Sequence, residues 1–132
     1  MSLFSHISFV NLYSHDQQRL VTFYRDVLGM GPVEPVEENN DHWFGFSGGN
    51  GLTFAIEPMT NRANYADVEY AKANPVLIQF AAEDRAQFDA MTAHLKEQHV
   101  PIVNEAKEMS YGRITNFLDP DGNLLEILLP KS

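Results

Sequence analysis

The sequence predicts an α+β fold made of two βαβββ modules, each a strand, a helix and three further strands. Three observations support this. A strand-like segment followed by an amphipathic helix occurs twice, with Asp16 and Asp84 at equivalent positions 68 residues apart. Turn-forming residues divide the chain after each helix into three short strand-like segments. The length of 132 residues, 44% of them hydrophobic, suits one domain, residues 1–132.

The first module, residues 4–58, begins with a segment rich in strand-forming residues from His6 to Tyr13. Ser14 and Gln17 then have the spacing of a capping box at a helix N-terminus. Apolar residues follow with the spacing of one helical stripe, at Leu20, Phe23, Tyr24, Val27 and Leu28. Gly29 is placed to end this helix.

Three short strands are expected after this helix, at Gly31–Glu37, His42–Ser47 and Leu52–Glu57. The turn-forming residues of 39–41 and 48–51 separate them. A linker, residues 59–73, comes next and lacks clean periodicity. One short helix is expected within it, at Ala66–Ala73.

The second module, residues 74–130, repeats the pattern. A strand is expected at Val76–Ala82, and Glu83-Asp84 opens a helix that carries Phe88, Met91 and Leu95. Val100-Pro101 ends that helix. The last three strands are expected near Ile102–Ala106, Gly112–Phe117 and Leu124–Leu129. The turn sequence of residues 119–123 separates the last two.

The register of the repeat predicts two different faces for the first strand of each module. The 68-residue offset aligns Val10 and Leu12 with Ile78 and Phe80. Side chains alternate along a strand, so these four residues share a face, which is expected to pack on the helix. On the opposite face, Phe9 aligns with Leu77, and Asn11 aligns with Gln79.

Composition excludes several classes of function. Nine basic residues against eighteen acidic ones give a net charge of −9, which disfavours nucleic acid and anionic membrane as partners. No apolar run approaches the roughly 20 residues of a membrane helix, and no signal-peptide pattern is visible. The absence of cysteine rules out disulfides and thiolate ligands, and it suits a cytoplasmic protein.

Two motifs carry a family resemblance. Residues 23–29 read Phe-Tyr-Arg-Asp-Val-Leu-Gly at the end of the first helix, and residues 119–126 read Asp-Pro-Asp-Gly-Asn-Leu-Leu-Glu into the last strand. Together with the repeat, they resemble the vicinal oxygen chelate superfamily of glyoxalase I, bleomycin-resistance proteins and extradiol dioxygenases. The resemblance implies a cup-shaped sheet that encloses a small-molecule ligand, and a homodimer.

The resemblance also implies where metal ligands would lie, in the first and last strand of each module. The last-strand position of module two falls on Glu126, and the first-strand position of that module falls on Leu77. The corresponding positions of module one fall on Phe9 and Phe54. Catalytic zinc and non-haem iron need histidine and carboxylate ligands that three of these four positions lack. The expectation is therefore no cofactor and no metal site of the family type.

Glu126 is the strongest candidate for the site, because every neighbour in its strand is aliphatic and an unpartnered charge there is costly. The sequence allows three roles for Glu126. The carboxylate contacts a cationic or hydroxyl group of a ligand, acts as a catalytic base without metal, or forms a structural ion pair with Arg113.

Further candidate ligand contacts surround this position. His42 and Phe44 alternate with Trp43, so at least one large ring should face the ligand, although core packing is the alternative for each. Tyr111 and Arg113 precede the last hairpin, at the rim of the pocket in the resembling family. Arg113 has three interpretations there: it holds an anionic group, it pairs with Glu126, or it is a surface arginine. The amides of Asn11 and Gln79 are placed to bond a ligand, each other or water. Phe9, Phe54 and Leu77 complete the expected apolar lining.

Two functional hypotheses follow. The first is a metal-free protein, similar to bleomycin-resistance proteins, that binds a small aromatic or cationic molecule in an apolar cup. The second is a metal-dependent enzyme of the glyoxalase or dioxygenase type, a lyase, isomerase or oxygenase. The fold and Glu126 agree with both hypotheses, and the missing histidine ligands favour the first.

Overall fold

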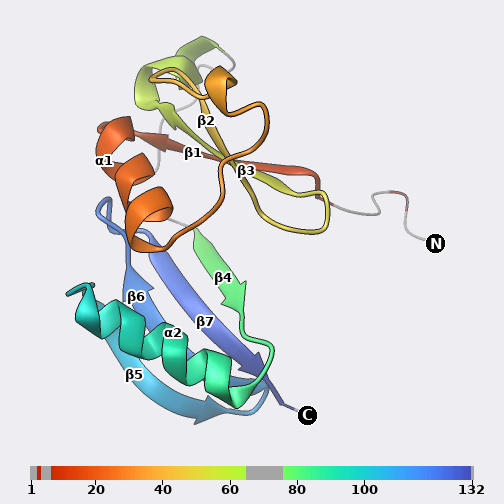
Figure 1. The fold of residues 1–132 in the computed structure, drawn as a ribbon, viewed down its shortest axis with the longest axis vertical. Helices are drawn as coiled ribbons and strands as arrows, with labels where there is room; N and C mark the ends of the chain where they lie inside the picture. The colour runs from red at the N-terminus through yellow and green to blue at the C-terminus, as the bar shows by residue number, and fades with distance from the viewer. Residues whose placement is uncertain (1–2, 4–6, 65–75, 132) are drawn as a thin grey trace. The chain divides into compact units, whose positions relative to one another are not determined.

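The computed structural model describes residue 3, residues 7–64 and residues 76–131, which fall into two units, residues 1–69 and 70–132 (Figure 1). Each unit has its own sheet and its own helix packed on one face. The sheets have three and four strands, which confirms the predicted mixed α+β class. The short helix expected at Ala66–Ala73 lies outside the described residues.

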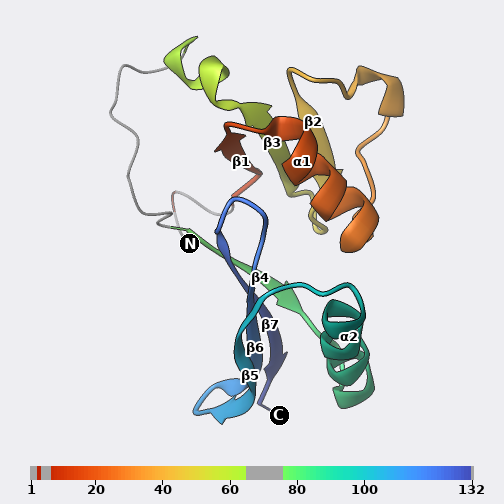
Figure 2. The same cartoon turned by 90° about the vertical axis from the view of Figure 1, so that its left-hand side faces the viewer.

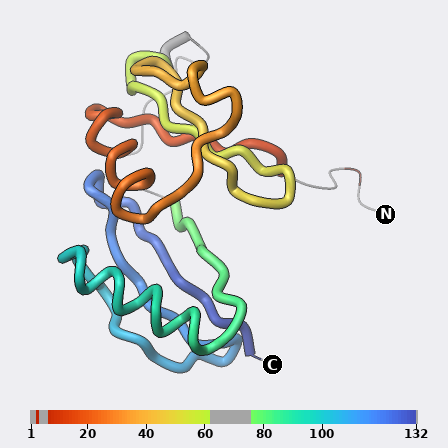
Figure 3. The backbone as a smooth tube through the Cα atoms, viewed as in Figure 1, coloured from red at the N-terminus to blue at the C-terminus, as the bar shows by residue number. Residues whose placement is uncertain are grey.

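The first unit is built around a three-stranded sheet with the order β1-β3-β2. Strand β1 pairs in parallel with β3, and β2 pairs with β3 in antiparallel orientation. Figure 3 traces the long connection between the helix and β2. The elements are β1 (Phe9–Ser14), α1 (Gln17–Thr22), the π-helical turn η1 (Phe23–Val27), the 3-10 turn η2 (Val36–Glu38), β2 (Phe44–Ser47), β3 (Thr53–Pro58) and the 3-10 turn η3 (Met59–Asn64).

Aromatic rings fill the core between the helix and this sheet. Tyr24 is fully buried, with its ring centroid 5.0 Å from Phe54 and 6.4 Å from Phe46. Leu12 and Leu20 complete the layer from β1 and α1. The apolar stripe of the helix and the alternation of β1 therefore meet as the sequence predicts.

The helix begins differently from the prediction of a capping box at Ser14 and Gln17. Asp16 is the N-cap, and its carboxylate accepts a hydrogen bond from Arg19 N at 3.1 Å. Ser14 Oγ instead accepts from Asp16 N at 3.0 Å, which supports the cap from the strand end. At the other end, Gly29 has a φ of +76°, the left-handed conformation expected of a residue that terminates a helix.

The strand predicted at Gly31–Glu37 is wrong for most of its length. Only an isolated bridge between Pro32 and Phe46 forms, flanked by hydrogen bonds from Val33 N to Gly45 O and from Ser47 N to Gly31 O. Pro32 and Pro35 have no N–H, so this segment cannot extend the ladder, and the chain turns into η2.

The second unit contains a four-stranded sheet with the order β4-β7-β6-β5, in which β4 and β7 are parallel and the other pairs antiparallel. All five elements predicted for this module are present. They are β4 (Leu77–Ala81), α2 (Arg85–Glu97), β5 (Ile102–Met109), β6 (Gly112–Leu118) and β7 (Leu124–Pro130).

Helix α2 lies along one face of this sheet (Figures 1 and 2). Asp84 caps it by accepting from Gln87 N at 2.8 Å, at the position equivalent to the N-cap Asp16 of the first unit. Phe88 is fully buried, and the hydroxyls of Thr92 and Thr115 lie 3.2 Å apart between the helix and β6. Across the described part of the chain, every helix is too short or too polar to cross a bilayer.

Candidate functional site

Each sheet has one face that packs on its helix and one face turned away from it, here termed the open face. In the second unit, Thr115 of β6 contacts α2, so strand alternation places its neighbour Asn116 on the open face. The register pairs Asn116 with Glu126 of β7, and Glu126 with Gln79 of β4. Asn104 of β5 pairs with Asn116 on the other side.

These four side chains form a continuous hydrogen-bonded row across all four strands, here termed the amide row. Gln79 Nε2 donates to Glu126 Oε2 at 2.7 Å, and Asn116 Nδ2 donates to Glu126 Oε1 at 3.1 Å. Asn104 Nδ2 donates to Asn116 Oδ1 at 3.0 Å. Both oxygens of the Glu126 carboxylate are thus held by neutral amides, which fixes its position.

The turn before β7 sets the register that builds the row. Asp119 Oδ1 accepts from the backbone N–H groups of Asp121 and Asn123, both at 2.9 Å, and its Oδ2 accepts from Asn123 Nδ2 at 2.8 Å. This closed turn pairs Leu118 with Leu124, so that Glu126 comes opposite Asn116 two residues further on. The sequence motif of residues 119–126 therefore acts as one structural unit.

Glu126 is a buried carboxylate, only 5% exposed, with no cation within ion-pair distance among the side chains that the structure describes, those of residues 7–61 and 76–131. The ion pair considered with Arg113 does not form. Arg113 lies on the α2 face of β6, where its guanidinium lies 5.6 Å above the Phe88 ring and Nη1 bonds Glu108 at 2.7 Å. Odd and even positions of a strand face opposite ways, which explains the separation.

In the first unit, the equivalent cross-strand row consists of Asn11, Ala55 and Gly45. Both polar atoms of the Asn11 side-chain amide are buried, and no described group bonds them. This contrasts with its repeat partner Gln79, which bonds Glu126. A buried amide without partners costs roughly 1–3 kcal/mol, so a hydrogen-bond partner for Asn11 would be stabilising.

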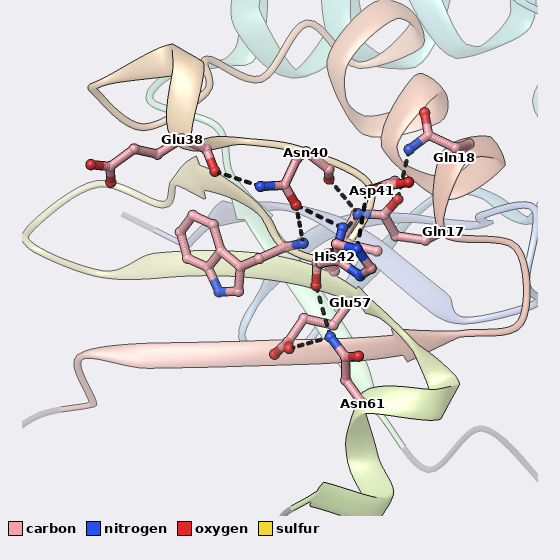
Figure 4. Close-up of polar contacts among 10 residues, drawn as sticks. Gln17, Gln18, Glu38, Asn40, Asp41, His42, Glu57 and Asn61 are labelled. Carbon is pink, nitrogen blue, oxygen red and sulfur yellow. Dashed lines mark hydrogen bonds and ion pairs between the residues drawn. The ribbon is translucent and has the colours of Figure 1, made fainter.

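The indole of Trp43 lies across Gly45 on the same open face. Its ring fills the space where a Cβ at residue 45 would stand, so only glycine fits there. Asn40 positions this segment, because its Oδ1 accepts from His42 N at 2.7 Å and from Trp43 N at 3.1 Å. Figure 4 shows the Asn40 and His42 contacts.

Glu57 is a second buried carboxylate that the sequence analysis missed. It is 7% exposed, lies on the open face of β3, and accepts from Asn61 Nδ2 at 3.0 Å (Figure 4). Asn61 also donates to His42 O at 2.8 Å. The signal was present, because Glu57 is a lone carboxylate in an apolar strand, just as Glu126 is.

Phe54 does not belong with Phe9 on the open face, which corrects the sequence-based placement. It pairs with Val10 rather than Phe9 and packs on Tyr24 in the core. The strand register matches Glu126 with Ala55, one residue away from Phe54.

The expected aromatic contact also changes. His42 lies in the turn before β2, with its side chain 80% exposed beside Asp41. Phe44 faces the helix, where Arg25 lies 5.9 Å from its ring centroid. Trp43 is therefore the ring of this cluster on the open face, and the other two are not.

Three remaining candidates are surface residues. Phe9 and Leu77 begin β1 and β4 and are 45% and 50% exposed. Tyr111 lies in the β5–β6 hairpin, and its carbonyl accepts from Lys131 N at 3.1 Å. Leu77 shares the open face of the second unit with Glu126, since its β7 partner is Leu124.

Within the described residues, few donor atoms lie at the positions expected for metal ligands of the family type. No group of three histidine, aspartate or glutamate side chains that could hold a metal ion occurs within the described ranges. Phe9 and Leu77 offer no donor atom, and the two oxygens of Glu126 are already bonded by Gln79 and Asn116. The arrangement suits hydrogen bonding and charge recognition instead.

Comparison with known proteins identifies the sequence family. Residues 4–127 match the profile of the Glyoxalase/Bleomycin resistance protein/Dioxygenase superfamily. No curated protein matches the chain by sequence.

Solved structures share the fold at low sequence identity. A lactoylglutathione lyase from Agrobacterium tumefaciens is 22% identical, with a TM-score of 0.72 over 95% of this chain and 93% of that one. TnmS3, an antibiotic binding protein from Streptomyces sp. CB03234, is 21% identical, with a TM-score of 0.69 over 99% and 100%. A glyoxalase-related enzyme from Fulvimarina pelagi is 17% identical, with a TM-score of 0.78 over 94% and 87%.

Proposed function

Because the chain belongs to the Glyoxalase/Bleomycin resistance protein/Dioxygenase superfamily, we propose that it binds a small molecule on the open face of its second unit without a resident metal. The ligand has a flat apolar body and one cationic or hydroxyl group. Glu126 orients that polar group, and aromatic and aliphatic side chains cover the body.

The observation that supports this proposal most directly is that the buried Glu126 carboxylate has hydrogen-bond partners but no neutralising cation among the described residues. The carboxylate is buried and held in place by two neutral amides, yet no cation within the described residues neutralises it. Removing a carboxylate from water is costly unless it is paired as well as hydrogen-bonded. A cationic or hydroxyl group from a ligand supplies the missing interaction and gains a charge-assisted hydrogen bond.

The open face of the first unit, taken by itself, also offers contacts for a planar ligand. The Trp43 indole lies over Gly45, whose neighbour across the sheet is the small residue Ala55. The amide of Asn11 in the same row has a donor and an acceptor without partners among the described groups. A planar ligand with a polar edge matches this combination.

The relatives are compatible with binding and with catalysis. TnmS3 is an antibiotic binding protein, whereas the Agrobacterium protein is a lactoylglutathione lyase, and both share this fold. Fold alone does not decide between the two classes. The donor set favours binding, since the positions equivalent to family ligands in the first strands are Phe9 and Leu77.

The test compares benzamidine, a flat cation, with benzamide, its neutral analogue of nearly the same shape. Calorimetric titration should show benzamidine binding roughly tenfold or more tightly, the difference a charge-assisted hydrogen bond supplies. Equal affinities for the two compounds, or binding of neither, would contradict a site that recognises charge through Glu126.

Purified protein is expected to contain no stoichiometric zinc, nickel or iron, because Glu126 is the single retained family ligand. Elemental analysis of protein purified without chelators measures this. Stoichiometric metal in the purified protein, lost in Glu126→Gln, would contradict the proposal. That result would favour the metal-dependent enzyme, for which the second buried carboxylate, Glu57, is the one supporting observation.

A further inference from the structure

A cavity of about 300 Å³ lies on the α2 side of the second unit, between the start of α2, the β5–β6 hairpin and the end of β7. Arg85, Arg113 and Lys131 line it, with Glu108 as the single acid. Met109 and Leu129 supply apolar surface. Three of the nine basic residues of a chain with a net charge of −9 are thus gathered around one small cavity.

The cavity is separate from the amide row. Arg113 pairs with Leu129 across β6 and β7, and both belong to the α2 face. Glu126 lies on the opposite, open face of β7. Any ligand of this cavity therefore binds on the other side of the sheet.

The cations are only weakly neutralised by neighbouring acids. The side chain of Glu108, which pairs with Arg113, is 69% exposed to solvent. In the Arg85–Asp89 pair, both side chains are more than half exposed. Exposed ion pairs of this kind contribute little and exchange readily. Lys131 has no ion pair with any residue that the structure describes.

The environment of Arg113 favours binding of an anion in addition to the Glu108 carboxylate. Its guanidinium is held against the Phe88 ring, its side chain is 22% exposed, and its buried Nε–H has no acceptor among the described groups. A planar guanidinium held in place offers paired N–H donors that match a carboxylate or phosphate group.

We propose that this cavity, here termed the basic pocket, binds a small organic anion, a carboxylate or phosphate ester with an apolar body. The anionic oxygens meet Arg85, Arg113 and Lys131, and the apolar body rests on Met109 and Leu129. The cavity volume lies at the lower end of small-molecule sites, which suits a compact ligand.

The experiment titrates isotopically labelled full-length protein with benzoate, phenyl phosphate and the neutral analogue benzyl alcohol, at constant ionic strength. Saturable shifts of the backbone amide signals of Gly112, Arg113 and Lys131 are expected with the two anions and not with benzyl alcohol. The variant Arg85→Gln/Lys131→Gln should weaken anion binding roughly tenfold, while sparing the Arg113–Phe88 contact.

The matched control is Lys96→Gln/Lys107→Gln, which removes the same charge from exposed positions of the same unit outside the cavity. It should leave anion affinity unchanged. Equal weakening in both variants, shifts that do not saturate, or an equal response to benzyl alcohol would overturn the basic pocket. Benzamidine binding at Glu126 is independent of these outcomes, so the two proposals fail separately.

Discussion

Replacing Glu126 with glutamine is expected to weaken benzamidine binding by roughly 10- to 100-fold, the range for loss of a buried charge-assisted hydrogen bond. Affinity for neutral benzamide should change little. The fold should survive with a stability change below about 1 kcal/mol. The oxygen of the introduced amide can still accept from Asn116, and the exposed amide of Gln79 can turn so that its own oxygen accepts from the introduced NH₂ group. Calorimetric titration and urea unfolding measure the two effects.

Glu97→Gln is the control for this experiment, because it removes one exposed carboxylate of α2 and the same charge. It should leave both affinity and stability unchanged. A Glu126→Gln protein that binds benzamidine normally but loses several kcal/mol of stability would show that the carboxylate has a structural role alone.

Replacing Phe46 with alanine should have the largest effect on stability, a loss of about 3–5 kcal/mol. The ring is fully buried, with centroids 5.1 Å from Phe44, 6.3 Å from Phe54 and 6.4 Å from Tyr24. Its removal leaves a cavity at the centre of the core of the first unit. Since domains are stable by only about 5–15 kcal/mol, urea unfolding should detect this at once.

Phe9→Ala is the matched control for the core variant. It removes the same ring from the open face of β1, where Phe9 is 45% exposed, so a loss of less than about 1 kcal/mol is expected. A similar loss in both variants would mean that Phe9 is buried in solution.

The features predicted most accurately from the sequence are those that depend on neighbouring residues, such as the positions of helices, strands and turns. Turn residues and helical spacing located α2 and the strands of the second unit to within a few residues, and Asp84 caps its helix as the repeat implies. The prediction failed where a backbone donor was missing, since Pro32 and Pro35 reduce an expected strand to one bridge. Prolines break ladders in a way that β-propensity does not describe.

The candidate site was harder to predict, because strand partners are not visible in a single sequence. Periodicity assigned Asn11 and Gln79 to the face of each first strand that is opposite the helix. The pairing of strands, which the sequence does not show, places Gln79 beside Glu126 and Glu126 beside Asn116. Phe54 was misplaced by one residue, and a one-residue slip moves a side chain to the opposite face of a sheet. The ion pair considered between Arg113 and Glu126 does not form, because the two residues lie on opposite faces of the sheet.

The direction of the hydrogen bonds in the amide row makes one side of the row sensitive to substitution and the other side tolerant of it. A carboxylate only accepts hydrogen bonds, so Glu126 turns the NH₂ group of Asn116 toward itself and leaves the Asn116 oxygen for Asn104. Asn116 is buried, and replacing it would remove the hydrogen bonds to both Glu126 and Asn104. Gln79 is exposed at the edge of the sheet, and under the proposed function a ligand cation would take its place on Glu126. Substitution at residue 79 is therefore the route by which selectivity can change while the rest of the row is kept.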